Sequence, residues 1–179
     1  IKQAITSAGA IDDIMRALKA FPENASVQEK GCGAIWSLCV NTHNRVVLVR
    51  AGACPRIVKA LREFIATESM VRTAIGAMRT LSPELEAREQ FKMLQASKWI
   101  AKAMVVHRSC VSVQRDGCAF LSNCAVDIEK QHVSTVPIEE LDAVVQAIAQ
   151  HRQEVSIMQG ACFALRNYTH QDKNCRSLR

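Results

Sequence analysis

The sequence of 179 residues is poor in turn-forming and aromatic residues, with seven Gly, four Pro, two Trp, one Tyr and five Phe. So few Gly and Pro argue against a many-stranded β-sandwich or barrel. No stretch approaches the roughly 18 consecutive apolar residues of a membrane-spanning helix, and the first residues, from Ile1 onward, lack the pattern of a secretory leader. With 49% hydrophobic and 22% charged residues, the composition predicts a soluble all-α chain, and we expect a piece of a longer protein.

The sequence also lacks a block of like charges. Its 23 Lys and Arg against 17 Asp and Glu give a net charge of +6. The basic residues are scattered, as at Arg16, Lys59 and Lys102. A nucleic-acid-binding arm would show a run of about five or six. The charge therefore allows an acidic or nucleic-acid partner without requiring one.

Close cysteine pairs of the C-x-x-C type are missing as well. The eight cysteines stand far apart, at 32, 39, 54, 110, 118, 124, 162 and 175. A zinc site needs closely spaced ligands, so we expect no metal. No G-K-[ST] motif is present, so we expect no nucleotide and no other cofactor. Reduced, buried thiols are typical of an intracellular protein, which predicts a cytoplasmic location and leaves the nucleus open.

An internal repeat organises the chain, with a period of 43 residues and one later step of 44. Apolar residues recur at this period at two positions three residues apart: Ile14, Ile57, Ile100 and Val144, and Ala17, Ala60, Ala103 and Ala147. Residues at this spacing share one face of a helix, so each copy predicts an amphipathic helix. One copy cannot bury its apolar face alone, so neighbouring copies should stack.

A second, longer helix should follow in each copy. Its expected N-cap is a recurring serine: Ser26, Ser69, Ser112 and Ser156. Glu29 and Gln159, three residues after two of these serines, fit a capping box. A third, short segment runs from 44 to 50 and ends at Gly52, with Gly9 one period earlier, where Gly can adopt a left-handed turn. Each unit therefore reads short helix, helix, longer helix.

These segments resemble the armadillo (ARM) repeat. The resemblance lies in residues 27–38 (VQEKGCGAIWSL), followed by Asn41, Asn44 and Ala51-Gly52. Residues 113–123 (VQRDGCAFLSN) and 162–167 (CFALRN) repeat it, with Asn174 in the place of Asn44. HEAT repeats have an overlapping period but two helices per unit, so the short segment at 44–52 favours the armadillo form.

The resemblance implies an armadillo-type right-handed α-solenoid of about four three-helix repeats. They would form a single array, with repeats at about 1–42, 43–84, 85–127 and 128–170, a first short helix at 1–8 and a further repeat beginning at 171–179. In this family the third helices line a concave groove that binds extended peptides. In the nuclear-import and catenin branches, an Asn in each repeat holds the peptide backbone.

The expected groove residues can be compared at equivalent positions of successive repeats, and we call each such set of residues a column. The Asn column holds Ser37, Thr80, Asn123 and Asn167. The column in which import receptors carry Trp holds Gly33, Gly76, Ala119 and Phe163, so we do not expect recognition of a basic localisation peptide. Neighbouring columns contain several Arg, which suit an acidic peptide but fit an ordinary solvated helix face slightly better. The residues expected to bind a partner are Trp36, Ser37, Arg72, Arg79, Thr80, Arg115, Asn123, Phe163, Arg166 and Asn167.

Periodicity argues against catalysis by a Cys/His pair. Cys32, Cys118 and Cys162 fall at one repeat position, as expected for packing residues. His107 and His151 align with Phe21 and Phe64 at the expected ends of the second helices. Trp99 fits packing at a helix start, whereas Trp36 fits either inter-repeat packing or an exposed peptide anchor. We therefore expect no enzyme.

The sequence as a whole predicts a non-catalytic scaffold that binds an extended peptide of a partner protein. The alternative is a basic helical-repeat protein that binds nucleic acid, and the salt dependence of binding would separate the two. Neither end of the chain shows a polar replacement for the apolar stripe, so we also expect self-association through the ends.

Overall fold

The computed structural model describes residues 9–125 and 137–171. This part of the chain is all-α and contains no strand. Its helices are α2 (Ala10–Ala20), α3 (Ala25–Leu38), α4 (Thr42–Arg50), α5 (Ala53–Glu63), α6 (Glu68–Leu81), α7 (Leu85–Met93), α8 (Ala96–Val106), α9 (Val111–Cys124), α10 (Ile138–Gln150) and α11 (Val155–Gln171). The short helix expected at 1–8, and Asn174 and Cys175, lie outside the described residues.

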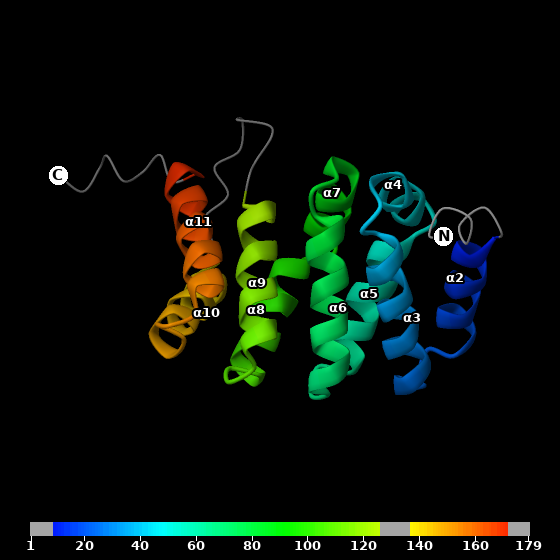
Figure 1. The fold of residues 1–179 in the computed structure, drawn as a ribbon, viewed down its shortest axis with the longest axis horizontal. Helices are drawn as coiled ribbons and strands as arrows, with labels where there is room; N and C mark the ends of the chain where they lie inside the picture. Colours follow the sequence, from blue (N-terminus) through cyan, green and yellow to red (C-terminus); the bar gives the residue numbers. More distant parts are fainter. Residues whose placement is uncertain (1–8, 126–136, 172–179) are drawn as a thin grey trace.

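The helices stand in two rows (Figure 1). The longest, α3, α6, α9 and α11, stand side by side and each packs on the next; we call them the front row. The helices that precede them, α2, α5, α8 and α10, form a back row in which each also contacts its neighbours. The short helices α4 and α7 lie at the upper end of the molecule in this view.

The described units repeat the same order of helix lengths. The helices α4, α5 and α6 contain 9, 11 and 14 residues, and α7, α8 and α9 repeat these lengths. This is the expected order of short helix, helix and longer helix. Among the described residues, no helix is long and apolar enough to span a bilayer.

The predicted apolar stripe lies in the core between the rows. Ile57, Ile100 and Val144 are completely buried. The recurring alanines three residues later, Ala60, Ala103 and Ala147, are at most 2% exposed. These small side chains let the two rows approach closely, which explains why Ala recurs there. In α2 the equivalent residues are only half-buried.

The predicted serine caps are wrong by two residues in each long helix. The helix α3 begins after Asn24, whose side chain accepts a hydrogen bond from the Val27 amide at 3.1 Å. The helices α6 and α9 begin after Thr67 and Cys110. Each recurring serine therefore lies inside the first turn of its helix and is not the N-cap.

The glycines expected at left-handed turns do adopt that conformation. Gly9 and Gly52 have φ angles of 82° and 83°, and each immediately precedes a back-row helix. One period later the same position is Gln95, with φ of 51°. A side chain in this region costs about 1 kcal/mol relative to Gly. The turn geometry is therefore set by the fold and not by Gly alone.

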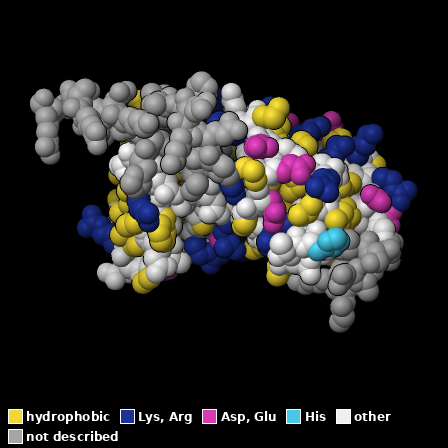
Figure 2. Space-filling view, turned by 90° about the horizontal axis from the view of Figure 1, so that it is seen from above, with side chains coloured by type: hydrophobic (Ala, Val, Ile, Leu, Met, Phe, Trp, Pro, Cys, Tyr) yellow, Lys and Arg dark blue, Asp and Glu magenta, His cyan; other side chains and the backbone are white. Residues whose placement is uncertain are grey.

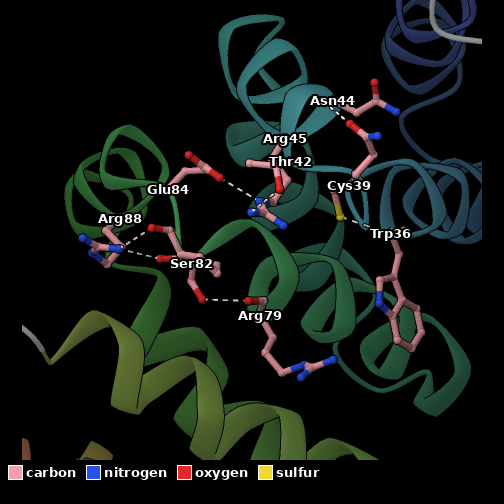
Figure 3. A network of polar contacts seen from close by, with 11 residues as sticks. Trp36, Cys39, Thr42, Asn44, Arg45, Arg79, Ser82, Glu84 and Arg88 are labelled. Carbon is pink, nitrogen blue, oxygen red and sulfur yellow. Dashed lines mark hydrogen bonds and ion pairs between the residues drawn. The ribbon is translucent and has the colours of Figure 1, made fainter. Parts of the chain in front are cut away.

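Ion pairs tie the short helices together at the upper end of the molecule. Arg45 and Glu84 are 2.7 Å apart, and both side chains are largely buried (Figure 3). Arg50 and Glu86 form a second, exposed pair at 3.6 Å. Seen from above, basic and acidic side chains lie close together over this end (Figure 2). These arginines are therefore engaged within the fold.

Candidate functional site

The residues predicted to bind a partner all belong to front-row helices. They fall into two groups. One group is exposed and consists of Ser37, Arg72, Phe163 and Arg166. The other is half-buried and consists of Trp36, Arg79, Thr80, Arg115, Asn123 and Asn167. In the half-buried group, Trp36, Arg79, Asn123 and Asn167 contact a neighbouring unit, so the front row combines packing and surface roles.

Trp36 lies over the backbone of the next helix. A Cβ atom built on Gly76 would lie 2.7 Å from Cζ2 of the indole, so the ring occupies the space that a side chain there would need. Of the two interpretations of Trp36, this contact favours packing between α3 and α6. Figure 3 shows Trp36 and Arg79 leaving their helices on the same side, away from the Arg45–Glu84 pair.

A buried carboxylate joins two arginines at the centre of the row. Asp116 in α9 is 1% exposed. Arg115 donates to both of its oxygens, at 2.9 Å from Nε and 3.2 Å from Nη2. Arg79 in α6 approaches the same carboxylate with Nε 3.3 Å from Oδ1. Both arginine side chains remain 42% exposed, so the two guanidiniums are held together and still accessible from solvent.

Electrostatics favour an anion at this cluster. The hydrogen bonds and charge of Asp116 raise the pKa of Arg115, so its guanidinium stays charged. Two cations against one buried carboxylate leave an excess of one positive charge. Nε of Arg79 is buried beside Asp116, so a ligand would have to bind the other nitrogens of this guanidinium. A carboxylate from a partner would add hydrogen bonds to guanidiniums that are already positioned.

Asp116 was not among the predicted site residues. It belongs to the 113–123 segment, where it counted only as part of the repeat pattern. The sequence could have identified it through the repeat-equivalent residues, which are Lys30, Thr73, Asp116 and Gly160. Asp116 is the one acidic residue among these four. An acid at a position that faces an Arg column indicates an ion pair between neighbouring units.

The two asparagines of the Asn column already have partners within the fold. Asn123 donates from Nδ2 to Oγ of Ser82 at 2.7 Å. Asn167 donates from Nδ2 to the carbonyl of Ser122 at 3.0 Å. Each bond links a front-row helix to the preceding unit. The carboxamides are therefore oriented by their neighbours, and one donor is engaged in each.

At Gly160, α11 packs closely against the backbone of α9. A Cβ atom built on Gly160 would lie 3.2 Å from Cβ of Cys118 and 3.3 Å from the backbone nitrogen of Ala119. Distances in this range are tighter than ordinary van der Waals contact. The helices can meet this closely because position 160 carries no side chain.

The exposed group differs from the half-buried one in its contacts. Arg72 and Arg166 make no ion pair with any residue in the described ranges. Phe163 is 54% exposed, in the column that contains Gly or Ala in the preceding units. In the half-buried group, by contrast, Thr80 donates to the Gly76 carbonyl of its own helix at 2.8 Å. Within the described chain, the two arginines are thus free to contact a partner.

The histidines lie at helix ends, as predicted. His107 and His151 are the C-caps of α8 and α10. Nε2 of His107 is 2.7 Å from the Ile65 carbonyl, and Nε2 of His151 is 2.7 Å from the Arg108 carbonyl. Both rings therefore connect one inter-helix turn to the equivalent turn of the preceding unit, as the periodic spacing suggests.

Two of the three thiols at the shared repeat position are buried. Cys32 and Cys118 have no exposed surface, and burial raises the pKa of each thiol to about 12. They stay protonated at neutral pH and are poor nucleophiles. Cys162 is exposed, because no described helix covers that side of α11. Across residues 9–125 and 137–171, no cluster of His, Cys, Asp or Glu is arranged to hold a metal ion.

The back row carries a separate basic patch around Trp99. The guanidinium carbon of Arg62 lies 4.9 Å from the ring centroid, and Nζ of Lys102 lies 5.3 Å from it. Lys59 and Lys98 are exposed on the same two helices, α5 and α8. Trp99 is half-buried, in line with the predicted packing role, and both cations gain from its ring.

No protein-family model matches the sequence. Among solved structures, the fold is similar to the crystal structure of an engineered protein that was a target of the Northeast Structural Genomics Consortium. The TM-score is 0.68 and the sequence identity is 18%, over 95% of this chain. The chain spans 66% of the length of that engineered protein. At this level of identity the similarity shows the helical fold alone.

Proposed function

We propose that this chain is an armadillo-type right-handed α-solenoid that acts as a non-catalytic scaffold. In this proposal, a partner protein lays an extended, acidic segment along the front row. Support comes from the repeated order of helix lengths, the stacked rows and the resemblance of the sequence segments to armadillo repeats. The free thiols fit a reducing, cytoplasmic location.

The Arg79–Asp116–Arg115 cluster is the observation that carries the proposal. Buried Asp116 holds two half-exposed guanidiniums at one point of the front row. Prepositioned cations lose little side-chain entropy when they bind a carboxylate, which favours an acidic ligand. Arg72 and Arg166 add exposed charge on the neighbouring turns and helices.

Protonated core thiols and helix-end histidines support a binding role over catalysis. The buried cysteines have raised pKa values, so they do not supply a thiolate at neutral pH. His107 and His151 are engaged with backbone carbonyls of the preceding turns. These two thiols and two imidazoles therefore support the fold, which favours the binding role in this proposal.

Peptide binding tests the proposal. A fluorescein-labelled peptide of alternating Glu and Ser is titrated by fluorescence polarisation against the chain and against Arg72→Gln/Arg166→Gln. Both arginines are exposed and unpaired among the described residues, so the variant should fold normally. We expect affinity to fall about 5- to 30-fold, because exposed charge contacts are worth roughly 0.5–1 kcal/mol each and the variant removes two of them. Lys59→Gln/Lys102→Gln on the back row is the control, and a larger effect there would contradict the front-row assignment.

Nucleic-acid binding is the second candidate, and the patch around Trp99 favours it. Lys59, Arg62, Lys98 and Lys102 lie on adjacent helices, and none pairs with an acidic residue of the described chain. A labelled single-stranded 20-mer titrated at several NaCl concentrations tests it. Contacts to about four phosphates would give a steep salt dependence that Lys59→Gln/Lys98→Gln reduces. A peptide bound on the front row would be unaffected by that substitution.

A further inference from the structure

The indole of Trp36 lies on α6 from the α3 side. A Cβ atom built on Gly76 would lie 2.7, 2.8 and 2.8 Å from Cζ2, Cε2 and Cη2 of the ring, so the ring packs directly on the α6 backbone. Trp36 also packs against the hydrophobic core, yet it is only half-buried. An aromatic ring in a fixed position therefore presents part of its surface to solvent.

The charged cluster lies on the opposite side of α6. Arg79, three residues after Gly76, has its Nε 3.3 Å from Oδ1 of Asp116 in α9, and its side chain is 42% exposed. Arg115 donates to both oxygens of the same carboxylate. A partner segment that crosses α6 along the front row would therefore meet first the ring and then two positioned cations.

The ring and the cluster face the same space. Figure 3 shows Trp36 and Arg79 leaving their helices on the same side. Gly76, which the ring covers, and Arg79 are one helical turn apart on α6, a separation of about 5–6 Å. Each of the two side chains is held by a neighbouring helix, Trp36 by α6 and Arg79 by Asp116 in α9. Neither has to be ordered when a partner binds, which lowers the entropy cost of binding.

The separation of ring and cluster fits two side chains on one face of an extended peptide. The axes of packed helices are about 8–10 Å apart, which bounds the distance between the two interfaces that flank α6. The ring shortens this distance because it reaches over Gly76. In an extended chain, residues i and i+2 point to the same side and lie roughly 7 Å apart. An apolar side chain on Trp36 would therefore bring the residue two positions away to the Arg79–Asp116–Arg115 cluster.

We propose that the front row selects a partner segment in which an apolar residue and an acidic residue are separated by one residue. The apolar side chain covers Trp36, and the carboxylate binds Arg79 and Arg115. This inference rests on the proposed function, since it specifies the acidic segment that binds there. Tryptophan and arginine are among the residue types that contribute most to binding at protein interfaces. An acidic segment without the apolar residue would leave the open part of the ring uncovered, so it should bind more weakly.

Two peptides of identical composition test the spacing. The peptide ESESFSESE places Phe on the same side of an extended chain as its Glu residues, two residues from the nearest ones. The peptide ESEFSSESE moves Phe by one residue, which turns it to the opposite side. Both carry N-terminal fluorescein and are titrated against the chain by fluorescence polarisation. We expect the first to bind about 3- to 10-fold tighter, because its Phe buries apolar surface on the ring.

Substitutions assign this preference to Trp36. Trp36→Leu keeps an apolar contact with α6 and removes the open ring surface, so the ratio of the two dissociation constants should fall to within about twofold. Trp99→Leu makes the same change on the back row and should leave the ratio unchanged. Circular dichroism checks that each variant keeps its helices.

A fluorescence measurement replaces Trp36→Leu if that variant loses its helices. In Trp99→Phe, Trp36 is the one tryptophan left in the chain. Its emission should shift to shorter wavelength with ESESFSESE and not with ESEFSSESE, because only the first peptide covers the ring.

The outcomes separate this inference from the proposed function. Equal affinity of the chain for the two peptides would overturn the inference, as would an unchanged ratio in folded Trp36→Leu or an unshifted Trp36 emission. If the alternating Glu and Ser peptide still bound in a manner dependent on Arg72 and Arg166, the proposed function would stand without the inference. If none of the three peptides bound, both would be overturned.

Discussion

The α3–α6 and α6–α9 interfaces use the same repeat positions with different chemistry. In the first, Trp36 covers the backbone at Gly76. In the second, Arg79, one period after Trp36, meets buried Asp116. The repeat spacing therefore determines which positions come together. The residue at each position then determines whether the contact is an apolar seal or a charged cluster that a ligand can use.

The largest expected effect comes from breaking the charged interface. Asp116→Ala leaves Arg79 and Arg115 without their shared carboxylate, and Asp116 is nearly fully buried. We expect a loss of about 2–3 kcal/mol in the free energy of unfolding, below the value for a fully buried pair because the arginines are half-exposed. Urea unfolding measures it. Thr73→Ala, at the equivalent position of α6, is the control and should cost less than about 1 kcal/mol.

The apolar interface can be broken by adding one methyl group. Gly76→Ala would place Cβ 2.7 Å from the Trp36 ring, so the indole must move, at a cost of roughly 1–2 kcal/mol. Gly33→Ala is the matched control, since its Cβ would lie 3.6 Å from Cγ2 of Thr73, an ordinary contact. There we expect stabilisation of about 0.5–1 kcal/mol from helix propensity. Thermal unfolding of both variants should show opposite signs, and equal shifts would contradict the Trp36 packing.

A third comparison concerns one cysteine position of the repeat, which is buried in one unit and exposed in another. Cys32→Ala removes a fully buried sulfur and should cost on the order of 1 kcal/mol. Cys162→Ala, at the equivalent position on the exposed side of α11, should change stability by less than about 0.5 kcal/mol. Chemical denaturation of the reduced protein distinguishes them. A similar loss for both would contradict the exposed position of Cys162.

The smallest expected effect concerns the turns before the back-row helices. Gln95→Gly should stabilise the chain by roughly 0.5 kcal/mol, since Gln95 has a positive φ where Gly9 and Gly52 occupy the equivalent turns. Gly52→Ala is the reciprocal substitution and should destabilise it by about 1 kcal/mol. Differential scanning calorimetry resolves both, and a Gln95→Gly variant with a lower Tm would contradict the backbone assignment.

Features that follow from the period were predictable from the sequence. The buried stripe through Ile57, Ile100 and Val144, the left-handed Gly52 and the helix-end His107 all lie where the repeat places them. These features depend on backbone positions, which recur in every unit. Comparing the repeats within this one sequence is therefore enough to predict them.

Features that depend on which side chains meet were not predictable in the same way. The helix starts were misplaced because a Ser beside an apolar residue fits the first turn as well as the cap, and Asn24 was available two residues earlier. Asp116 and Trp36 needed the register between neighbouring helices, which a period alone does not contain. The peptide-binding role of Asn123 and Asn167 stays a prediction, now with one donor of each amide engaged internally.

The close packing of α11 on α9 makes position 160 sensitive to the size of its side chain. Lys30, Thr73, Asp116 and Gly160 occupy the same place in successive helices, so residue size there acts as a spacer. At Gly160 the spacer is absent, and a methyl group would push α11 from Cys118 and Ala119 by a few tenths of an ångström. The missing side chain at position 160 thus determines how closely α11 packs on α9.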